Sequence, residues 1–403
     1  MAEPAGAAPT AGPFKILVLN QISPNGLKRL PSHDYLTGKD IPDPDAVLVR
    51  SADLHGMDIP ATVKAIGRAG AGTNNIPVQA MSLRGVPVFN APGANANAVK
   101  ELVLAGMLMA ARNLAPAQRF VDRLDPGARD LDKTVEEGKK IFAGVELAGQ
   151  TLGVIGLGKI GCLVADAAIK LGMKVLGYDP EITVDAAWSL PAQVRKAGTV
   201  ADVLKNANFI TLHVPLVDAT RELVNEKNVG LAKPGAVLLN FSREGVVSDP
   251  AVLAALDSGQ LSWYVCDFPS GRILKHPKVV ALPHLGASTR EAEESCAIMV
   301  ADELRDFLEH GNVINAVNFP NVAMERESRY RVAIANANVP NMLGQISTAM
   351  ANAGLNIHNM VNKSRGDMAY TLVDVDSPVG DAVISALRAI EGVLAVRYLP
   401  TAR

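Results

Sequence analysis

Cysteine, aromatic residues and net charge are all scarce in this sequence of 403 residues. Its three cysteines, Cys162, Cys266 and Cys296, lie far apart and form no Cys-x-x-Cys pair. That distribution argues against a disulfide framework and favours a reducing, cytoplasmic setting. Aromatic residues make up only 4% of the chain, so the core must consist mostly of Val, Leu, Ile and Ala.

The sequence also lacks the features that would indicate a nucleic-acid or membrane partner. Its formal net charge is −2 and its isoelectric point is near 6.4, so it has no basic surface for polyanions. No apolar run approaches the roughly 20 residues that span a bilayer. Residues 1–12 are rich in Ala, Pro and Gly and lack the basic start and apolar stretch of a signal peptide, so we expect a disordered tail there.

What the sequence does contain is a glycine-rich segment after an apolar run, Leu152–Ile155, that suits a buried parallel strand. The glycines are spaced Gly-x-Gly-x-x-Gly: the first allows a tight turn, the second lets a pyrophosphate approach, and the third lets the following helix pack closely. The N-terminal amides of that helix, predicted over Ile160–Leu171, would face the phosphates. The residues expected at the cofactor here are Gly156, Gly158, Lys159, Ile160 and Gly161.

Asp179 strengthens the dinucleotide interpretation. It ends the next predicted strand, Lys174–Tyr178, and lies 18 residues after Gly161. An acid at this position hydrogen-bonds the ribose 2′-hydroxyl and repels a 2′-phosphate, which predicts NAD rather than NADP. The alternative is a tight turn between strand and helix that binds no ligand.

Strand and helix patterns alternate on both sides of this motif. They predict an α/β protein with two doubly wound parallel-sheet domains of the Rossmann or flavodoxin-like kind. A long helix over Thr289–His310 would lead back to the first domain and make it discontinuous. We expect residues 13–97 and 290–318 to form a substrate-binding domain, residues 98–289 an NAD-binding domain, residues 319–329 a linker and residues 330–403 a third domain.

The third domain shows a βαββαβ order of elements, from a strand at Tyr330–Ala335 to a strand at Val393–Tyr398. This order predicts the ferredoxin-like split βαβ arrangement. No catalytic constellation occurs in it, so a regulatory or assembly module is the expected role.

The candidate catalytic residues follow predicted strands, at the edge of the sheet where ligands bind in doubly wound folds. Arg243 could hold a substrate carboxylate through two hydrogen bonds, and His284 could transfer the proton that accompanies a hydride. Alternatively, Arg243 is a surface ion-pair residue and His284 a structural histidine. Further residues expected to line the cofactor are His213, Val214, Pro215, Ser242, Asp267, His284 and Gly286.

These motifs resemble the D-isomer-specific 2-hydroxyacid dehydrogenase family, and within it the phosphoglycerate dehydrogenases that carry a C-terminal ACT domain. The resemblance extends from about Phe14 to Tyr398. It implies NAD as the cofactor, no metal, Arg243 as carboxylate anchor and His284 as acid–base group. The implied reaction is the oxidation of 3-phospho-D-glycerate to 3-phosphohydroxypyruvate, the first step of L-serine biosynthesis.

Two early segments resemble those that hold the substrate's phosphate and carboxylate in phosphoglycerate dehydrogenases, and they supply the expected substrate residues Arg50, Ser51, Arg68 and Gly70. A dianionic phosphate needs such cationic and backbone donors. Two alternatives stay open. One is a dehydrogenase or reductase of an unphosphorylated 2-hydroxy acid, such as glyoxylate or hydroxypyruvate. The other is a non-catalytic, NAD-binding regulatory protein, since fold alone does not guarantee catalysis.

One departure from the family pattern concerns the partner of the catalytic histidine. The family normally places a glutamate there, but the corresponding position falls on Gly271 or on Arg272, depending on the alignment. The acids that could replace it are Asp267, Glu291 and Glu294.

The resemblance also implies that ACT domains pair edge to edge and bind L-serine between two subunits, as part of a homodimer or homotetramer. The matching candidates for a serine site are Asn336, Asn338 and Asn356, which could instead only cap turns. Asn336 stands where the family has histidine, and Asn341 stands where it has glycine.

Overall fold

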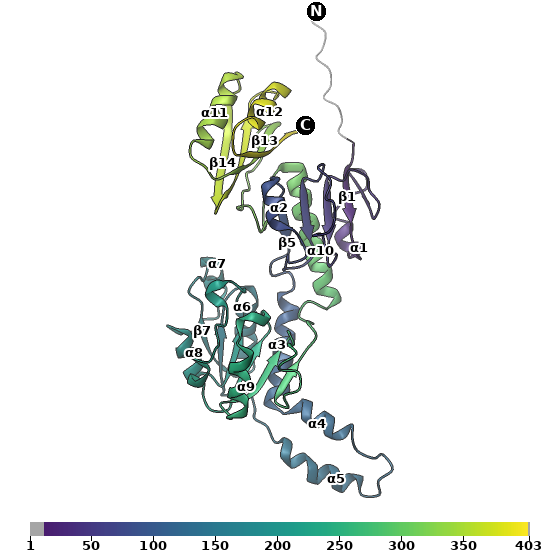
Figure 1. Cartoon of the computed structure of the whole chain (residues 1–403), viewed down its shortest axis with the longest axis vertical. Helices are drawn as coiled ribbons and strands as arrows, with labels where there is room; N and C mark the ends of the chain where they lie inside the picture. The colour runs from purple at the N-terminus through teal and green to yellow at the C-terminus, as the bar shows by residue number, and fades with distance from the viewer. Residues whose placement is uncertain (1–11, 402–403) are drawn as a thin grey trace, which may run out of the picture. The chain divides into compact units, whose positions relative to one another are not determined.

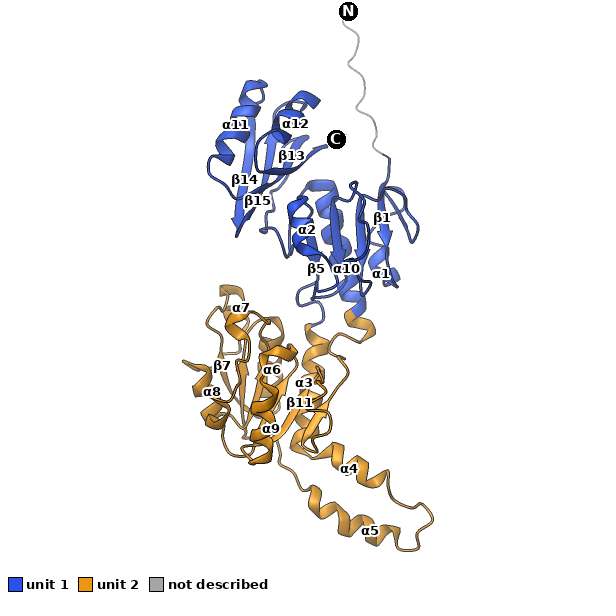
Figure 2. Cartoon of the chain, viewed as in Figure 1, with its two compact units in different colours: residues 1–95, 293–403 blue, residues 96–292 orange. Residues whose placement is uncertain are grey.

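The computed structural model describes residues 12–401, so the tail expected over residues 1–12 lies almost wholly outside the described residues. The chain divides into two compact units, which are described separately. Unit 1 comprises residues 1–95 and 293–403, and unit 2 comprises residues 96–292 (Figure 2). Both units contain parallel sheets covered by helices, so the expected α/β class is confirmed.

Unit 2 is built on a seven-stranded parallel sheet with the order β12-β11-β10-β9-β6-β7-β8 (Figure 1). The first strand of the unit, β6, pairs with β7 on one side and with β9 on the other. The strand order therefore reverses at β6, and ligands of doubly wound sheets bind beyond the carboxyl end of such a strand. The strands are β6 (Thr151–Ile155), β7 (Lys174–Tyr178), β8 (Arg195–Lys196), β9 (Phe209–Leu212), β10 (Ala236–Asn240), β11 (Leu261–Cys266) and β12 (Val279–Ala281).

Helices cover both faces of this sheet because its central strands are apolar on both sides. Side chains of α3 and α6 form one core cluster with the strands, and those of α8 and α9 form a second cluster with the opposite strand positions. The helices are α3 (Ala96–Ala111), α6 (Lys159–Lys170), α7 (Val184–Ser189), α8 (Val200–Asn206) and α9 (Asp249–Asp257), with short 3-10 turns at Asp218–Thr220, Val229–Leu231 and Glu244–Val246.

An arm of two helices, which the sequence patterns did not predict, extends from unit 2 (Figure 1). It consists of α4 (Leu114–Val121), α5 (Leu131–Gly138) and a 3-10 turn over Lys139–Phe142. Neither helix buries a single residue. The arm therefore lacks a core of its own beyond local contacts such as the one between the rings of Phe120 and Phe142.

Unit 1 contains a five-stranded parallel sheet with the flavodoxin-like order β2-β1-β3-β4-β5. The helix α10 (Arg290–His310) packs on it through a buried stripe that includes Ala297, Val300, Leu304 and Leu308. A side chain at Gly67 would collide with Val300 and Leu304, so this glycine allows the close approach of helix and sheet. The other elements are β1 (Phe14–Val18), α1 (Pro24–Leu27), β2 (Tyr35–Gly38), β3 (Ala46–Val49), β4 (Ala65–Arg68), α2 (Val78–Leu83) and β5 (Val88–Asn90).

The C-terminal residues form an antiparallel four-stranded sheet with the order β14-β15-β13-β16, as expected for a split βαβ arrangement. Residues of α11 and α12 share one core cluster with this sheet. The elements are β13 (Tyr330–Ala337), α11 (Met342–Asn352), β14 (Ile357–Arg365), β15 (Met368–Val375), α12 (Asp381–Arg388) and β16 (Val393–Pro400). This sheet belongs to the same compact unit as the five-stranded sheet.

The segment expected to be a linker, residues 319–329, is in fact packed. Phe319, Val322 and Met324 are buried, and Val322 pairs with Val313 in a short antiparallel bridge. Its lack of a regular period suggested a loose connection, but irregular backbone packs well where its polar groups find partners. Here the carbonyl groups of Met324 and Glu325 accept hydrogen bonds from Arg331.

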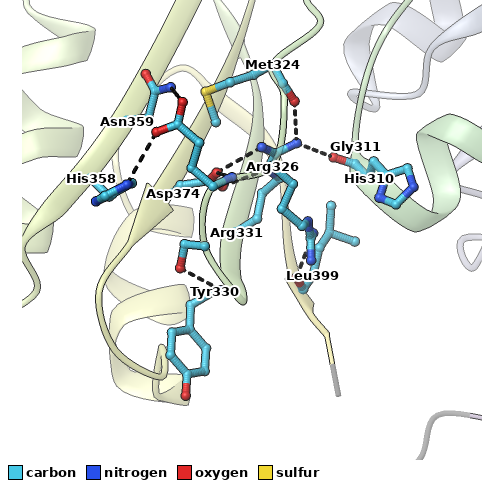
Figure 3. Close-up of polar contacts among 12 residues, drawn as sticks. His310, Gly311, Met324, Arg326, Tyr330, Arg331, His358, Asn359, Asp374 and Leu399 are labelled. Carbon is cyan, nitrogen blue, oxygen red and sulfur yellow. Dashed lines mark hydrogen bonds and ion pairs between the residues drawn. The ribbon is translucent and has the colours of Figure 1, made fainter. Parts of the chain in front are cut away.

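Arg331 joins three parts of unit 1 (Figure 3). Its guanidinium donates to both carboxylate oxygens of Asp374 on β15, at 2.6 and 2.9 Å, and both side chains are 0% exposed. It also donates to the carbonyl of His310, the last residue of α10. The carboxylate of Asp374 in turn accepts the amide of Glu327. The end of α10, the packed segment and the four-stranded sheet are thus held by one buried ion pair.

Candidate active site

The glycine-rich loop has the geometry that a dinucleotide requires. Gly156 has a φ of 91°, and a side chain there would collide with the carbonyl of His213. A side chain at Gly161 would collide with the carbonyl of Gly156, so α6 packs closely on β6. A side chain at Gly158 would meet nothing within 4 Å. Packing within the protein therefore does not require glycine at position 158. The open space there suits the pyrophosphate that the motif predicts.

Lys159 and Ile160 form the first turn of α6, whose N-terminal residue Gly158 offers no side-chain cap. The amides of this turn therefore remain available to an anion. The carboxylate of Asp179, at the end of β7, accepts the amide of Leu157 at 2.8 Å and the amide of Glu181 at 2.9 Å. Asp179 is thereby fixed beside the glycine-rich loop, where the motif predicts the ribose of NAD.

His213, Val214 and Pro215 follow β9, the strand on the other side of the reversal. The His213 ring interacts with the hydroxyl of Thr211 at 3.0 Å. Burial lowers the pKa of His213 to about 3, so its imidazole stays neutral near pH 7. A neutral ring is suited to lining a cofactor and unsuited to acid–base exchange near pH 7.

Arg243 and His284 come together around one aromatic ring, that of Phe268, which was not among the residues expected at the site. The guanidinium carbon of Arg243 lies 5.9 Å from the ring centroid of Phe268, and the His284 and Phe268 ring centroids are 4.6 Å apart. Both polar side chains are exposed. The structure therefore places a guanidinium and an imidazole in one neighbourhood that a ligand could reach. The backbone carbonyl of buried Ser242 accepts from Arg243 at 2.6 Å.

Asp267 fixes the loop that carries His284. This carboxylate is 1% exposed and accepts the amides of Leu285 and Gly286 at 2.7 and 2.8 Å. Burial raises its pKa, whereas these amide hydrogen bonds and the charge of His284 oppose the rise. His284 itself has a φ of 56°, a left-handed backbone conformation that is uncommon for residues other than glycine. Such strain is typical of positions that the surrounding structure holds for a function.

The resemblance implies an acid beside the His284 ring, and the described residues offer none. Gly271 has open space around it, and among residues 12–401 no carboxylate hydrogen-bonds the His284 ring. Of the three candidate replacements, Glu291 pairs with Arg290, and Glu294 accepts the side-chain amide of Asn25. Only Asp267 contacts the histidine loop, and it does so through backbone amides.

The four expected substrate residues lie in unit 1, at the carboxyl ends of β3 and β4: Arg68 is the last residue of β4, and the other three follow the strands. Arg68 donates from Nε to the carbonyl of Arg50 at 3.0 Å, and its guanidinium occupies the space that a side chain at Gly70 would need. Arg50 forms an ion pair with Glu293 on α10, with an N···O distance of 2.5 Å. The amide of Ser51 donates to the side chain of Asn20. The structure thus gathers Arg50, Arg68 and Gly70, together with an acid that the sequence analysis did not single out.

The three asparagines proposed for an effector do not gather in one chain. Asn336 was expected in a loop, but it lies on β13 opposite Ala369 and is 1% exposed, with its side-chain oxygen unpaired. The side chain of Asn338 donates to the carbonyl of Gly366. Asn356 lies at the other end of the sheet, because the next residue, Ile357, pairs with Val375, which in turn pairs with Tyr330. Tyr330 and Asn336 are six residues apart on β13, so about 20 Å of strand separates the two ends.

The departure at Asn341 has a simple explanation. Asn341 has a φ of 63° at the start of α11. Asparagine adopts this left-handed conformation more readily than other residues with a side chain, so it can replace the family's glycine here.

Among residues 12–401, no cluster of His, Cys, Asp or Glu side chains is arranged to hold a metal ion, and no helix is long and apolar enough to cross a membrane.

Comparisons with known proteins agree with this geometry. Residues 104–286 match the NAD binding domain of the D-isomer specific 2-hydroxyacid dehydrogenases. D-3-phosphoglycerate dehydrogenase of Methanocaldococcus jannaschii is 34% identical over 344 residues, which cover 83% of this chain and 62% of that protein. The enzyme of the same name from Escherichia coli strain K12 is 32% identical over 349 residues, 83% of this chain and 81% of that protein.

Solved structures extend the likeness to three dimensions. NAD+-bound 3-phosphoglycerate dehydrogenase from Entamoeba histolytica has a TM-score of 0.59 at 25% identity, and covers 76% of this chain and 99% of that one. The TT0316 protein from Thermus thermophilus has a TM-score of 0.62 at 26% identity, and covers 75% and 100%.

The chain spans about three fifths of the length of the relatives from M. jannaschii and Bacillus subtilis, at 62% and 59%. The E. coli enzyme is matched over most of its length. The NAD-binding domain expected from the glycine-rich loop is confirmed by the family match. The roles of individual residues remain predictions. The family match and the similarity to these relatives show that the chain belongs to the D-isomer-specific 2-hydroxyacid dehydrogenase family.

Proposed function

We propose that the protein is an NAD-dependent dehydrogenase that oxidises 3-phospho-D-glycerate to 3-phosphohydroxypyruvate, the first step of L-serine biosynthesis. The observation that carries this proposal is the placement of Arg243 and His284 against Phe268 in the NAD-binding unit. The similarity to enzymes named D-3-phosphoglycerate dehydrogenase supports the choice of substrate.

In this reaction Arg243 binds the substrate carboxylate, because a planar guanidinium can donate two parallel hydrogen bonds to it. His284 accepts the proton of the 2-hydroxyl group, and C2 becomes a carbonyl as it loses a hydride. Bound NAD would accept that hydride at its nicotinamide ring. Asp267 is a positioning residue, since it holds the His284 loop through the amides of Leu285 and Gly286. Asp179 disfavours NADP because its carboxylate would repel a 2′-phosphate.

Arg50, Ser51, Arg68 and Gly70 are proposed to bind the substrate phosphate. We expect wild-type protein to use 3-phosphoglycerate with a higher kcat/KM than D-glycerate. Replacing Arg68 with alanine should lower kcat/KM for the phosphorylated acid by at least about tenfold and affect D-glycerate much less, because an anion left without its charged partner is costly. Steady-state rates with a panel of phosphorylated and unphosphorylated 2-hydroxy acids measure both effects.

Arg29→Ala is the matched control, since Arg29 is an exposed arginine of the same unit that pairs with Asp302. It should leave the selectivity unchanged. Equal losses for both acids in Arg68→Ala would instead make Arg68 a structural residue and favour an unphosphorylated substrate. Absence of turnover with every acid, despite NAD binding, would favour the non-catalytic regulatory protein.

The C-terminal sheet is proposed to bind L-serine between two chains. Asn336 and Asn338 lie about 20 Å from Asn356 along the sheet of one chain, so a shared site needs the sheet edge of a second copy. We expect millimolar L-serine to lower kcat of the wild type, and Asn356→Ala to weaken that inhibition. Asn359→Ala, which removes an exposed amide bound to Glu327, is the control. Inhibition requires that serine bind one conformational state better than the other. A wild type insensitive to serine would leave assembly as the role of this sheet.

We also propose that the chain forms a homodimer or homotetramer. The arm of unit 2 exposes the apolar side chains of Leu114, Val121 and Ile141, while α4 and α5 bury nothing. Short helices without tertiary packing are marginally stable in water, so a second copy is the expected cover.

A further inference from the structure

Glu293 occupies a position of α10 that the helical period reserves for apolar residues. Counting four, seven and eleven residues onward along the helix gives Ala297, Val300 and Leu304, and all three are at most 1% exposed. A glutamate at the start of this stripe therefore faces the sheet rather than the solvent side of the helix. It lies where the stripe leaves the core, beside the carboxyl ends of β3 and β4.

Its partner there is Arg50, the first residue after β3. The Nη2 atom of Arg50 lies 2.5 Å from Oε1 of Glu293, and the two side chains are 36% and 41% exposed. Burial raises the pKa of Cys296, three residues along the helix, while the charges of Arg68 and Arg50 oppose that rise and Glu293 adds to it. The four groups therefore share one neighbourhood. An ion pair with this much exposure adds little to stability. The consequence of Glu293 is therefore a change in the charge presented to a ligand.

The ion pair between Arg50 and Glu293 changes the expected chemistry of the proposed phosphate subsite. Arg50 brings a positive charge to this subsite, and the carboxylate of Glu293 already pairs with that charge. A phosphate dianion must then either displace Glu293 from Arg50 or bind beside a carboxylate of like charge. An unphosphorylated acid, which places no phosphate in this subsite, is not affected in this way. The backbone of Arg50 remains fixed in either case, because its carbonyl accepts from Arg68 and from Asn75.

We propose that Glu293 is a specificity-determining residue that lowers the preference of this site for phosphorylated over unphosphorylated 2-hydroxy acids. This inference rests on the proposed function, in which Arg50 and Arg68 bind the substrate phosphate. Glu293 competes with that phosphate for Arg50 and so broadens the range of acids that the site accepts.

The test replaces the charge and keeps the shape. Glu293→Gln should raise the ratio of kcat/KM for 3-phosphoglycerate to that for D-glycerate by about tenfold, mainly through a lower KM for 3-phosphoglycerate. Glu293→Asp keeps the charge and should stay near the wild-type ratio. Glu294→Gln is the matched control: it makes the same change of net charge one residue along, where the side chain instead contacts Asn25.

A second measurement separates this inference from the proposed function. Calorimetry measures the binding of each acid to the complex of the protein with NADH. The acid cannot be oxidised in this complex, because the cofactor is already reduced. Glu293→Gln should tighten 3-phosphoglycerate about tenfold and D-glycerate less than twofold, whether or not the protein catalyses the oxidation. An unchanged ratio in Glu293→Gln, or an equal gain for both acids or in Glu294→Gln, would overturn the assignment. Loss of turnover with this binding pattern retained would contradict only the proposed reaction.

Discussion

Replacing His284 with alanine is expected to lower kcat by about 10²- to 10⁴-fold, the usual contribution of a general acid–base group. The imidazole is exposed beside Arg243 and Phe268, and among residues 12–401 no other histidine lies against this ring. His213 cannot replace it, because burial lowers the pKa of His213 to about 3. The measurement is the steady-state rate with saturating NAD and substrate.

Binding of NAD should change little in this variant, because the pyrophosphate and ribose sites lie on the glycine-rich loop and Asp179. His33→Ala serves as the control, since His33 is a highly exposed histidine that pairs only with its neighbour Asp34. If His284→Ala retained most of its turnover, another group would have to accept the hydroxyl proton, and the reaction proposed here would be wrong.

Replacing Asp374 with alanine is expected to destabilise unit 1 by about 3–5 kcal/mol, the cost of leaving one partner of a buried ion pair uncompensated. Arg331 would keep its charge at 0% exposure, with only backbone carbonyls to solvate it. The amide of Glu327 would also lose its acceptor. Hydrogen exchange of peptides from β13 and β15 measures the local free energy of unfolding.

The structure provides a close control for this prediction. Arg29 and Asp302 pair with the same Nε···Oδ1 distance of 2.6 Å as Arg331 and Asp374, but their side chains are 51% and 40% exposed. Removing that exposed pair by Asp302→Ala should cost no more than about 1 kcal/mol. Equal, small effects of Asp302→Ala and Asp374→Ala would show that the buried pair does not hold the four-stranded sheet to α10.

His284, the proposed acid–base group, is held in place by its own loop and by a neighbouring aromatic ring. In this chain, the buried carboxylate of Asp267 accepts two amides of the histidine loop, and Phe268 lies against the imidazole. Position is therefore supplied by the backbone and an aromatic ring. A carboxylate hydrogen bond to the ring is not needed to place His284 beside Arg243.

The sequence by itself determined the features that depend on local backbone chemistry. Gly156 was predicted from its motif because a turn with positive φ and a carbonyl contact admits no side chain. Asp179, Arg243 and His284 were predicted because parallel strands direct their carboxyl ends to one edge. The βαββαβ order followed from periodicity alone, and the sheet order β14-β15-β13-β16 agrees with it.

Only the tertiary structure decided the features that depend on residues far apart in the chain. The short strand β2 and the arm of α4 and α5 carry little periodic pattern, and the expected linker carried none. Arg331 and Asp374 are 43 positions apart, and Arg50 and Glu293 are 243 apart. Pairing over such separations depends on how the sheets and α10 pack, which no local pattern encodes. The motif thus located the candidate chemistry. Packing decided that an acid, Glu293, pairs with Arg50 at the proposed phosphate subsite, and that a buried ion pair joins the C-terminal sheet to α10.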